Sequence, residues 1–265
     1  MKKSARKIPV TLTIAGSDNS GGAGIQTDLK TFGNLATYGT TAITCVVAEH
    51  PGRVKSIHPV PAKIVEDQLT LVHEAFPVAA MKTGMLFSTE IIHSVAHILK
   101  SKARRKLVVD PVMVATSGAL LLKENAVLAL RERILPLATV VTPNLDEAAI
   151  LVGRKLTTLD EARQAAIDCS LMWKVPFLVK GGHLKLSESV DFLAVGRRVT
   201  AFRVKTVPNV KLHGTGCTFS AAICAYLAHG FSLEEAVRKA KDFITKAIQT
   251  RFKIGPYDIL NQIGR

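Results

Sequence analysis

Short apolar runs alternate with amphipathic segments along the whole chain, and this alternation constrains the fold more than any other feature. The runs rich in β-branched or small residues predict buried strands at 10–15, 41–48, 78–81, 107–109, 139–141 and 177–179. Between them, apolar residues recur at three- and four-residue spacing, as in 64–76 and 91–99, which predicts helices. Strands that alternate with helices form a mostly parallel sheet with helices on both faces. The sequence therefore predicts an α/β fold, a three-layer α/β/α sandwich.

Two regions interrupt this rhythm. Residues 53–60 and 191–204 read as short alternating segments, which predict antiparallel edge hairpins. The chain then closes with two predicted helices, 215–229 and 232–252. No linker, low-complexity stretch or repeat divides it, so we expect a basic tail over residues 1–9 and a single domain over residues 10–265.

Composition and charge exclude several classes of protein. The chain is 48% hydrophobic and 21% charged, which is globular composition, and no apolar run approaches the length of a membrane span. Its four cysteines lack the paired spacing of a disulfide framework or a metal site, which favours reduced thiols in the cytoplasm. The net charge is +14, but the basic residues are scattered and accompany no nucleic-acid-binding motif. We expect no nucleic-acid or membrane partner, and a preference for anionic substrates.

Two glycine-rich turns each precede a predicted helix. Gly21-Gly22-Ala23-Gly24 follows the first strand and has neither dinucleotide-fingerprint nor P-loop spacing. The second turn, Gly214-Thr215-Gly216-Cys217, offers backbone N–H groups to an anion. Because a thiol in the first turn of a helix lies at the positive end of its dipole, we expect the pKa of Cys217 to fall below about 8.5. Type and position together mark Cys217 as a candidate catalytic group.

Charged side chains follow three of the predicted strands. Asp110 ends one strand, Lys180 ends another, and Asn144 and Glu147 begin the helix after a third. Ligands of open α/β sheets gather at the carboxyl ends of the strands, so we expect these groups to meet the turn at 214–217 there. Two acids, a base and an anion-binding turn are the groups that phosphoryl transfer from MgATP requires.

These segments resemble the hydroxymethylpyrimidine/phosphomethylpyrimidine kinases of thiamine biosynthesis, a branch of the ribokinase superfamily that also contains pyridoxal kinase. The resemblance covers residues 11–248 and rests on six motifs: Ala-Gly-Ser-Asp with Gly-Gly-Ala-Gly-Ile-Gln from residue 15, Lys-Thr-Gly-Met-Leu from 82, Asp-Pro-Val-Met-Val-Ala-Thr-Ser-Gly from 110, Thr-Pro-Asn-x-x-Glu-Ala from 142, Val-Lys-Gly-Gly-His from 179 and His-Gly-Thr-Gly-Cys-Thr from 213. It implies a ribokinase-like fold, a homodimer, and ATP and Mg²⁺ as co-substrate and cofactor. It leaves open whether a monovalent cation assists.

The resemblance also implies roles for individual residues. Cys217 is the catalytic group, and Gly214, Thr215 and Gly216 form the anion hole. Asp110 and Glu147 organise Mg²⁺, while Lys180, Asn144 and Gly216 meet ATP. The remaining residues face the acceptor: Ala23, Val47, Met85 and Val112 pack against the ring, Asp28 lies on the acceptor side, and Glu49 reads the ring edge.

One departure keeps the substrate open. Where the pyrimidine kinases usually have Gln-Asn-Thr, this chain has Glu49-His50-Pro51. An ionised Glu only accepts hydrogen bonds, so it pairs with a ring protonated at nitrogen, either an aminopyrimidine or the pyridine of pyridoxal. Ala115, followed by Thr-Ser-Gly, favours the pyrimidine branch, because the related pyridoxal kinases carry a second Cys at that place. The alternatives are a pyridoxal/pyridoxine kinase of vitamin B6 salvage and a non-catalytic pyrimidine-binding regulator.

Overall fold

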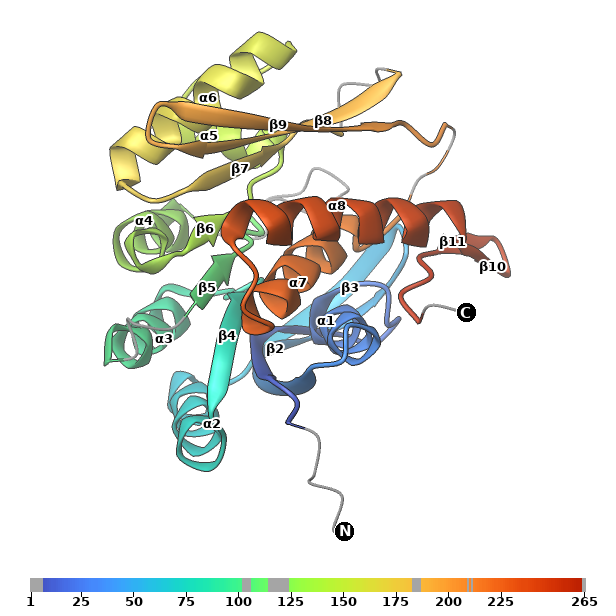
Figure 1. Ribbon diagram of the computed structural model, residues 1–265. Coiled ribbons are helices and arrows are strands. Elements are labelled where there is room, and N and C mark those ends of the chain that lie inside the picture. Colours follow the sequence, from blue (N-terminus) through green and yellow to red (C-terminus); the bar gives the residue numbers. More distant parts are fainter. Residues whose placement is uncertain are drawn as a thin grey trace, which may run out of the picture.

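The computed structural model describes residues 7–101, 106–113, 124–182, 187–208, 210 and 212–263. Their main feature is a nine-stranded sheet in the order β3-β2-β1-β4-β5-β6-β7-β8-β9 (Figure 1). Its strands are β1 (Val10–Asp18), β2 (Tyr38–His50), β3 (Arg53–Pro59), β4 (Val78–Thr83), β5 (Lys106–Val109), β6 (Val140–Val141), β7 (Phe177–Lys180), β8 (Glu188–Val195) and β9 (Arg198–Lys205). Strands β1, β2 and β4 to β7 run parallel, whereas β3, β8 and β9 are antiparallel to their neighbours. This confirms the predicted parallel sheet with edge hairpins.

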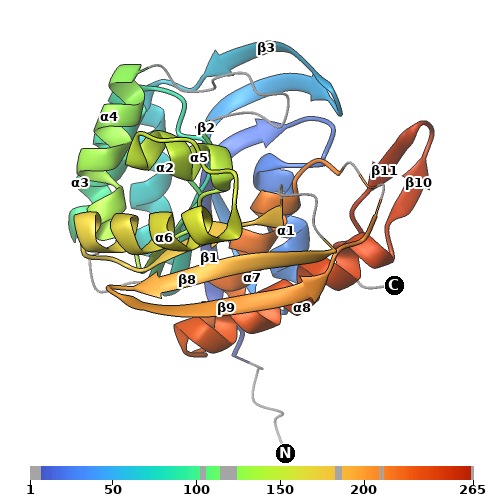
Figure 2. The same cartoon turned by 90° about the horizontal axis from the view of Figure 1, so that it is seen from above.

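Helices cover both faces of the sheet (Figures 1 and 2). One face carries α2 (Ala62–Ala75), α3 (Thr89–Ser101), α4 (Glu124–Arg133), α5 (Leu145–Val152) and α6 (Leu159–Trp173), with a short 3₁₀ turn at Leu135–Leu137. The other carries α1 (Gly24–Asn34), α7 (Thr215–Ala228) and α8 (Leu233–Gln249). In β5, Leu107 and Val109 pack into the first core while Val108 packs into the second, as the alternation of a doubly covered strand requires.

The chain differs from the prediction near its C-terminus. The last predicted helix, 232–252, ends instead at Gln249, and Phe252 begins a small hairpin of β10 (Phe252–Ile254) and β11 (Tyr257–Ile259). The turn between them contains Gly255, whose φ of 55° favours glycine, and Pro256. Among the described helices, none is long and apolar enough to cross a membrane.

The parallel strands bring the predicted site together at one edge of the sheet. Asp18 lies at the carboxyl end of β1, Lys82 is the second-last residue of β4, Asp110 comes just after β5, and Lys180 ends β7. Helices α1 and α7 also begin at this edge, and α5 begins after β6. The fold thus confirms the expected convergence of strand ends and helix starts.

Candidate active site

Helix α7 begins differently from three other helices. Asn144, Thr158 and Ser232 cap α5, α6 and α8 with reciprocal capping boxes. Helix α7 instead starts at Gly214, whose φ is 79°, and no side chain caps it. The N–H groups of its first turn therefore remain available to an anion, at the positive end of the helix dipole.

The turn at residues 214–217, which we call the α7 turn, packs directly against the turn at residues 21–24, the α1 turn. A Cβ on Gly214 would stand 1.8 Å from the carbonyl oxygen of Gly22 and 3.3 Å from Cα of Ala23. Only glycine fits at this contact. The two glycine-rich turns that the sequence placed far apart therefore form one continuous surface.

Asp110, Lys180 and Ser220 form a polar cluster beside the α7 turn. Lys180 Nζ donates to Asp110 Oδ1 at 3.1 Å, and Ser220 Oγ donates to Asp110 Oδ2 at 3.1 Å. A Cβ on Gly216 would lie 3.2 Å from Lys180 Nζ, so the ammonium reaches the start of α7. Ser220 is a site residue that the sequence prediction missed, although it lies one helical turn after Gly216 on the same face.

Glu147 is a buried carboxylate next to this cluster. Its Oε2 accepts from the backbone N–H of Asn144 at 2.9 Å, and its Oε1 accepts from that of Met113 at 3.2 Å. Burial raises the pKa of Glu147 to about 7, with Asp110 adding to the rise and Lys180 opposing it. In turn, Asn144 Oδ1 accepts from the backbone N–H of Glu147 at 2.9 Å, so Asn144 caps helix α5. Its contact with ATP stays a prediction.

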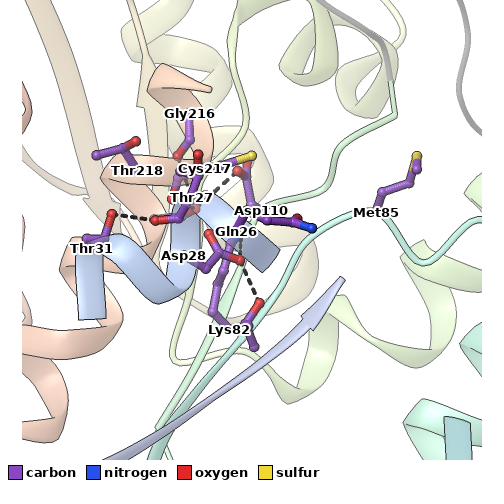
Figure 3. A network of polar contacts seen from close by, with 12 residues as sticks. Gln26, Thr27, Asp28, Thr31, Lys82, Met85, Asp110, Gly216, Cys217 and Thr218 are labelled. Atoms are coloured by element: carbon purple, nitrogen blue, oxygen red, sulfur yellow. Dashed lines mark hydrogen bonds and ion pairs between the residues drawn. The ribbon is translucent and has the colours of Figure 1, made fainter. Parts of the chain in front are cut away.

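The prediction that the pKa of Cys217 falls below its ordinary value is wrong for this structure. Burial of the thiol raises the pKa of Cys217 to about 11, and the Lys82 ammonium and the N–H of Gly24 oppose that rise. The dipole argument considered only the helix end, whereas desolvation of the sulfur outweighs it. Figure 3 shows Cys217 at the start of α7, close to Asp28 and Asp110.

Asp28 is sealed inside the protein rather than lining a pocket. Both its carboxylate oxygens lie 2.8 Å from Lys82 Nζ, and Thr13 Oγ1 donates to Oδ2 at 2.5 Å. The side chains of Asp28 and Lys82 are 0% exposed. The carboxylate of Asp28 thus has no exposed surface, and its expected place on the acceptor side stays a prediction. Lys82 begins the Lys-Thr-Gly-Met-Leu motif, but nothing in the sequence indicates that Asp28 is its ion-pair partner.

Glu49 lies close to Asp18, which precedes the α1 turn, and to His213, which precedes the α7 turn. His213 Nε2 lies 3.5 Å from Asp18 Oδ2 and 3.8 Å from Glu49 Oε2. Against the effect of burial, the His213 imidazole and the N–H groups of Ser20 and Ala23 hold the pKa of Asp18 well below its usual range. The adjacent Asp18 carboxylate raises the pKa of His213, and burial and the Asp18 charge raise that of Glu49. Asp18 therefore favours the charged form of His213 and disfavours the charged form of Glu49.

The apolar residues expected around the ring lie near or just after the ends of four strands, β1, β2, β4 and β5. Val47 pairs with Asp18 across β1 and β2, and Ala23 N donates to Asp18 Oδ2 at 2.7 Å. The Met85 carbonyl accepts from Thr44 Oγ1 on β2 at 2.6 Å. Val112 follows Asp110 with a φ of 42°, and its contact with a ring stays a prediction. Ala115 and the Thr-Ser-Gly that follows it, like His183, lie outside the described residues.

A parallel sheet with edge hairpins and an uncapped helix start at its carboxyl edge define a ribokinase-like small-molecule kinase. Solved structures agree. Pyridoxal kinase from Staphylococcus aureus in complex with AMP-PCP and pyridoxal has a TM-score of 0.88 and 36% identity, covering 97% of this chain and 94% of that one. Phosphomethylpyrimidine kinase from Clostridium difficile has a TM-score of 0.80 and 41% identity, covering 91% and 100%.

The chain belongs to the phosphomethylpyrimidine kinase family, whose model matches residues 18–260. It is 46% identical to the hydroxymethylpyrimidine/phosphomethylpyrimidine kinase of Haemophilus influenzae, covering 94% of both chains. It is 42% identical to the pyridoxine kinase of Bacillus subtilis, covering 93% of this chain and 92% of that one. It spans 50% of a thiamine biosynthesis bifunctional protein of Geobacter sulfurreducens, at 46% identity. The chain is thus a kinase, and the non-catalytic regulator is not supported.

Proposed function

We propose that the chain transfers the γ-phosphoryl group of ATP to the hydroxymethyl group of 4-amino-5-hydroxymethyl-2-methylpyrimidine, and then phosphorylates the monophosphate. The observation that carries this proposal is the uncapped α7 turn with Lys180 Nζ beside it, because together they offer backbone N–H groups and a cation to a phosphoryl group. Relatives bound to ADP or AMP-PCP support ATP as the phosphoryl donor.

Asp110 and Glu147 fit a magnesium ion. Both offer hard carboxylate oxygens, and Asp110 raises the pKa of Glu147, so a cation would relieve their mutual repulsion. Each carboxylate already accepts hydrogen bonds, which favours contact through the ion's water ligands. When bound, Mg²⁺ would neutralise charge on the phosphate oxygens. Lys180 would then bind a phosphate oxygen of ATP in addition to Asp110.

Cys217 is proposed to accept the proton of the acceptor hydroxyl. With a pKa of about 11, about one thiol group in ten thousand is ionised at pH 7. The step therefore uses a minor, ionised form of Cys217. Lys82 and the Gly24 N–H are the groups that favour that form. In a loose phosphoryl-transfer transition state the acceptor proton leaves late, which limits how strong a base is needed.

Glu49 is proposed to read the ring. Its carboxylate lies 3.8 Å from His213 Nε2, so it can exchange this imidazole for a protonated ring nitrogen and an amino group. A parallel assay with hydroxymethylpyrimidine, its monophosphate, pyridoxal and pyridoxine tests the proposal in the wild type and in Glu49→Gln. We expect Glu49→Gln to retain the pyrimidine activity and to weaken any pyridine activity. Loss of the pyrimidine activity alone would reverse the ranking.

Pyridoxal phosphorylation is the second candidate. It is favoured by the pyridine-binding relatives of closely similar fold, including the structure with bound pyridoxal. In the same assay, a higher kcat/KM for pyridoxal than for hydroxymethylpyrimidine would establish it as the main activity.

The homodimer that the resemblance implies is proposed too. Val46, on β2, and Val54, on the edge strand β3, are 50% and 43% exposed, and a second subunit would cover them. Light scattering of the purified protein tests this. A monomer at micromolar concentration would reject it.

A further inference from the structure

Three residues that follow β11 are buried, whereas the next residue, Ile263, is exposed. Leu260, Asn261 and Gln262 are only 3%, 5% and 2% exposed. The N–H of Asn261 donates to the Ala247 carbonyl at 3.1 Å, and Asn34 Nδ2 donates to the Gln262 carbonyl at 2.8 Å. The segment after β11 is therefore fastened to α8 and to the end of α1.

The side-chain amide of Gln262 joins two helices. Its Nε2 donates to Thr27 Oγ1 on α1 at 3.2 Å and to Thr218 Oγ1 on α7 at 2.9 Å. Both threonines are 0% exposed. A primary amide has two N–H groups on one nitrogen, and here each has its own acceptor. In a dry interior such a bridge holds its two ends at a defined separation.

The two threonines lie just behind the two glycine-rich turns. Thr27 is in the first turn of α1, after the α1 turn, and Thr218 follows Cys217 in the first turn of α7 (Figure 3). The turns touch so closely that Gly214 leaves no room for a Cβ against Gly22. The distance between the two helix starts therefore sets how the α1 turn meets the α7 turn.

This distance matters for the reaction because reacting groups must approach to about 3–3.5 Å, and a displacement of about 1 Å costs about a hundredfold in rate. In the proposed function, the α7 turn holds the phosphoryl group and the α1 turn borders the acceptor. We propose that Gln262 is a positioning residue for phosphoryl transfer, which holds the two turns in register through Thr27 and Thr218. This inference rests on the proposed function. Gln262 also lies beyond residues 18–260, the region that the family model matches.

The test compares Gln262→Leu with a matched control, Asn34→Ala. The control removes a hydrogen bond to the same C-terminal segment but leaves the amide bridge intact. We expect Gln262→Leu to lower kcat about tenfold or more at saturating substrates, with the KM for ATP changed less than about twofold. We expect Asn34→Ala to keep kcat within about twofold of the wild type. Urea unfolding of both variants measures how much each change costs in stability.

A second variant, Thr218→Val, breaks the bridge from the helix side with a side chain of nearly the same shape. If the bridge acts as a unit, the Gln262→Leu/Thr218→Val double variant loses no more kcat than the more impaired single variant. Multiplicative losses would overturn the proposal, as would an unchanged kcat in Gln262→Leu or an equal kcat loss in Asn34→Ala. If the wild type phosphorylates pyridoxal and not the pyrimidine, the substrate proposal fails. The same kcat comparison is then made with pyridoxal.

Discussion

Two lysine–aspartate pairs at the same edge of the sheet have the same chemistry but different surroundings. Lys82 Nζ lies 2.8 Å from Asp28, with both side chains 0% exposed. Lys180 Nζ lies 3.1 Å from Asp110, with 13% and 4% exposure. The sealed pair cannot exchange partners without opening the core. The open pair borders the α7 turn, so it can exchange partners with a phosphate or a cation.

The difference shows how a buried charge is assigned to structure or to function. Isolated buried charges are costly, so each member of the sealed pair needs the other to stay ionised. Burial lowers the pKa of the Lys82 ammonium, but the Asp28 carboxylate more than offsets this and raises it. The open pair adds a Ser220 hydroxyl to Asp110 and leaves Lys180 close to Gly216. We therefore expect the first pair to act on stability and the second on rate.

The largest expected effect breaks the sealed pair. Lys82→Met leaves the Asp28 carboxylate buried without a counter-charge, and we expect a loss of about 3–5 kcal/mol in the free energy of unfolding. Lys82→Met/Asp28→Leu should recover most of that loss, because it removes both charges. Lys180→Met is the matched control at the open pair and should cost less than Lys82→Met, because Lys180 is 13% exposed and Ser220 still donates to Asp110. Urea unfolding measures all three, and equal losses in the two lysine variants would contradict the comparison.

Next in size is the open pair. Asp110→Asn should lower kcat about 10²–10³-fold, because charge stabilisation at the transferring group is lost. The free energy of unfolding should change little, since the amide can still accept from Ser220. Steady-state kinetics with urea unfolding decides the point. A stable variant with near-normal kcat would remove Asp110 from the proposed metal site.

Cys217 is influenced by a residue of each pair. Lys82 lowers the pKa of its thiol and Asp110 raises it. Cys217→Ala should reduce kcat on hydroxymethylpyrimidine about a hundredfold, and less on the monophosphate, which with a second pKa of about 6 is already mostly dianionic at pH 7. Because the thiol pKa is about 11, the wild-type rate on the first acceptor should rise with pH from 7 upward.

Cys224→Ala, which removes a buried thiol from the same helix, is the control for Cys217→Ala. It should affect both acceptors equally. If Cys217→Ala also slows the two steps to the same extent, then Cys217 packs the site and does not accept a proton.

The smallest effect concerns Glu147, at the side of the open pair. Its folded pKa of about 7 exceeds the ordinary 4.5, so between these values the folded state binds more protons than the unfolded state. The free energy of unfolding should therefore fall as pH rises through this window, by about 1–3 kcal/mol. Glu147→Gln keeps the capping box and should flatten that slope. Urea unfolding at pH 5 and pH 7 measures it, and an unchanged slope would mean that other groups cause it.

The sequence predicted those parts of the site that depend on position along the chain. Asp110 and Lys180 were placed correctly because both follow apolar strands, and parallel strands end at one edge. The α7 turn was located because glycines surround a helix start. These inferences need only the strand and helix pattern, so they were available before the structure.

Parts that depend on packing were missed or wrong. The sequence predicts a lowered pKa for Cys217, but the structure raises it. Burial of the sulfur causes the rise, and burial is a tertiary property that the sequence does not show. The partners of Lys82 and Gln262 come from positions up to 235 residues away in the chain, and no local signal marks them. The helix predicted to end at Phe252 ends at Gln249, and the hairpin of β10 and β11 that follows it is not predicted from the sequence. Gly255 and Pro256, just beyond Phe252, were the available signal for a turn.

The contact between Gly214 and Gly22 limits how this protein can be changed. Because a Cβ at Gly214 would stand 1.8 Å from the Gly22 carbonyl, the two turns must be inherited as one unit even though they come from opposite ends of the chain. A chimera that takes only one turn from a relative would combine surfaces that were never fitted to each other. Engineering of acceptor choice should therefore exchange residues 18–24 and 213–217 together.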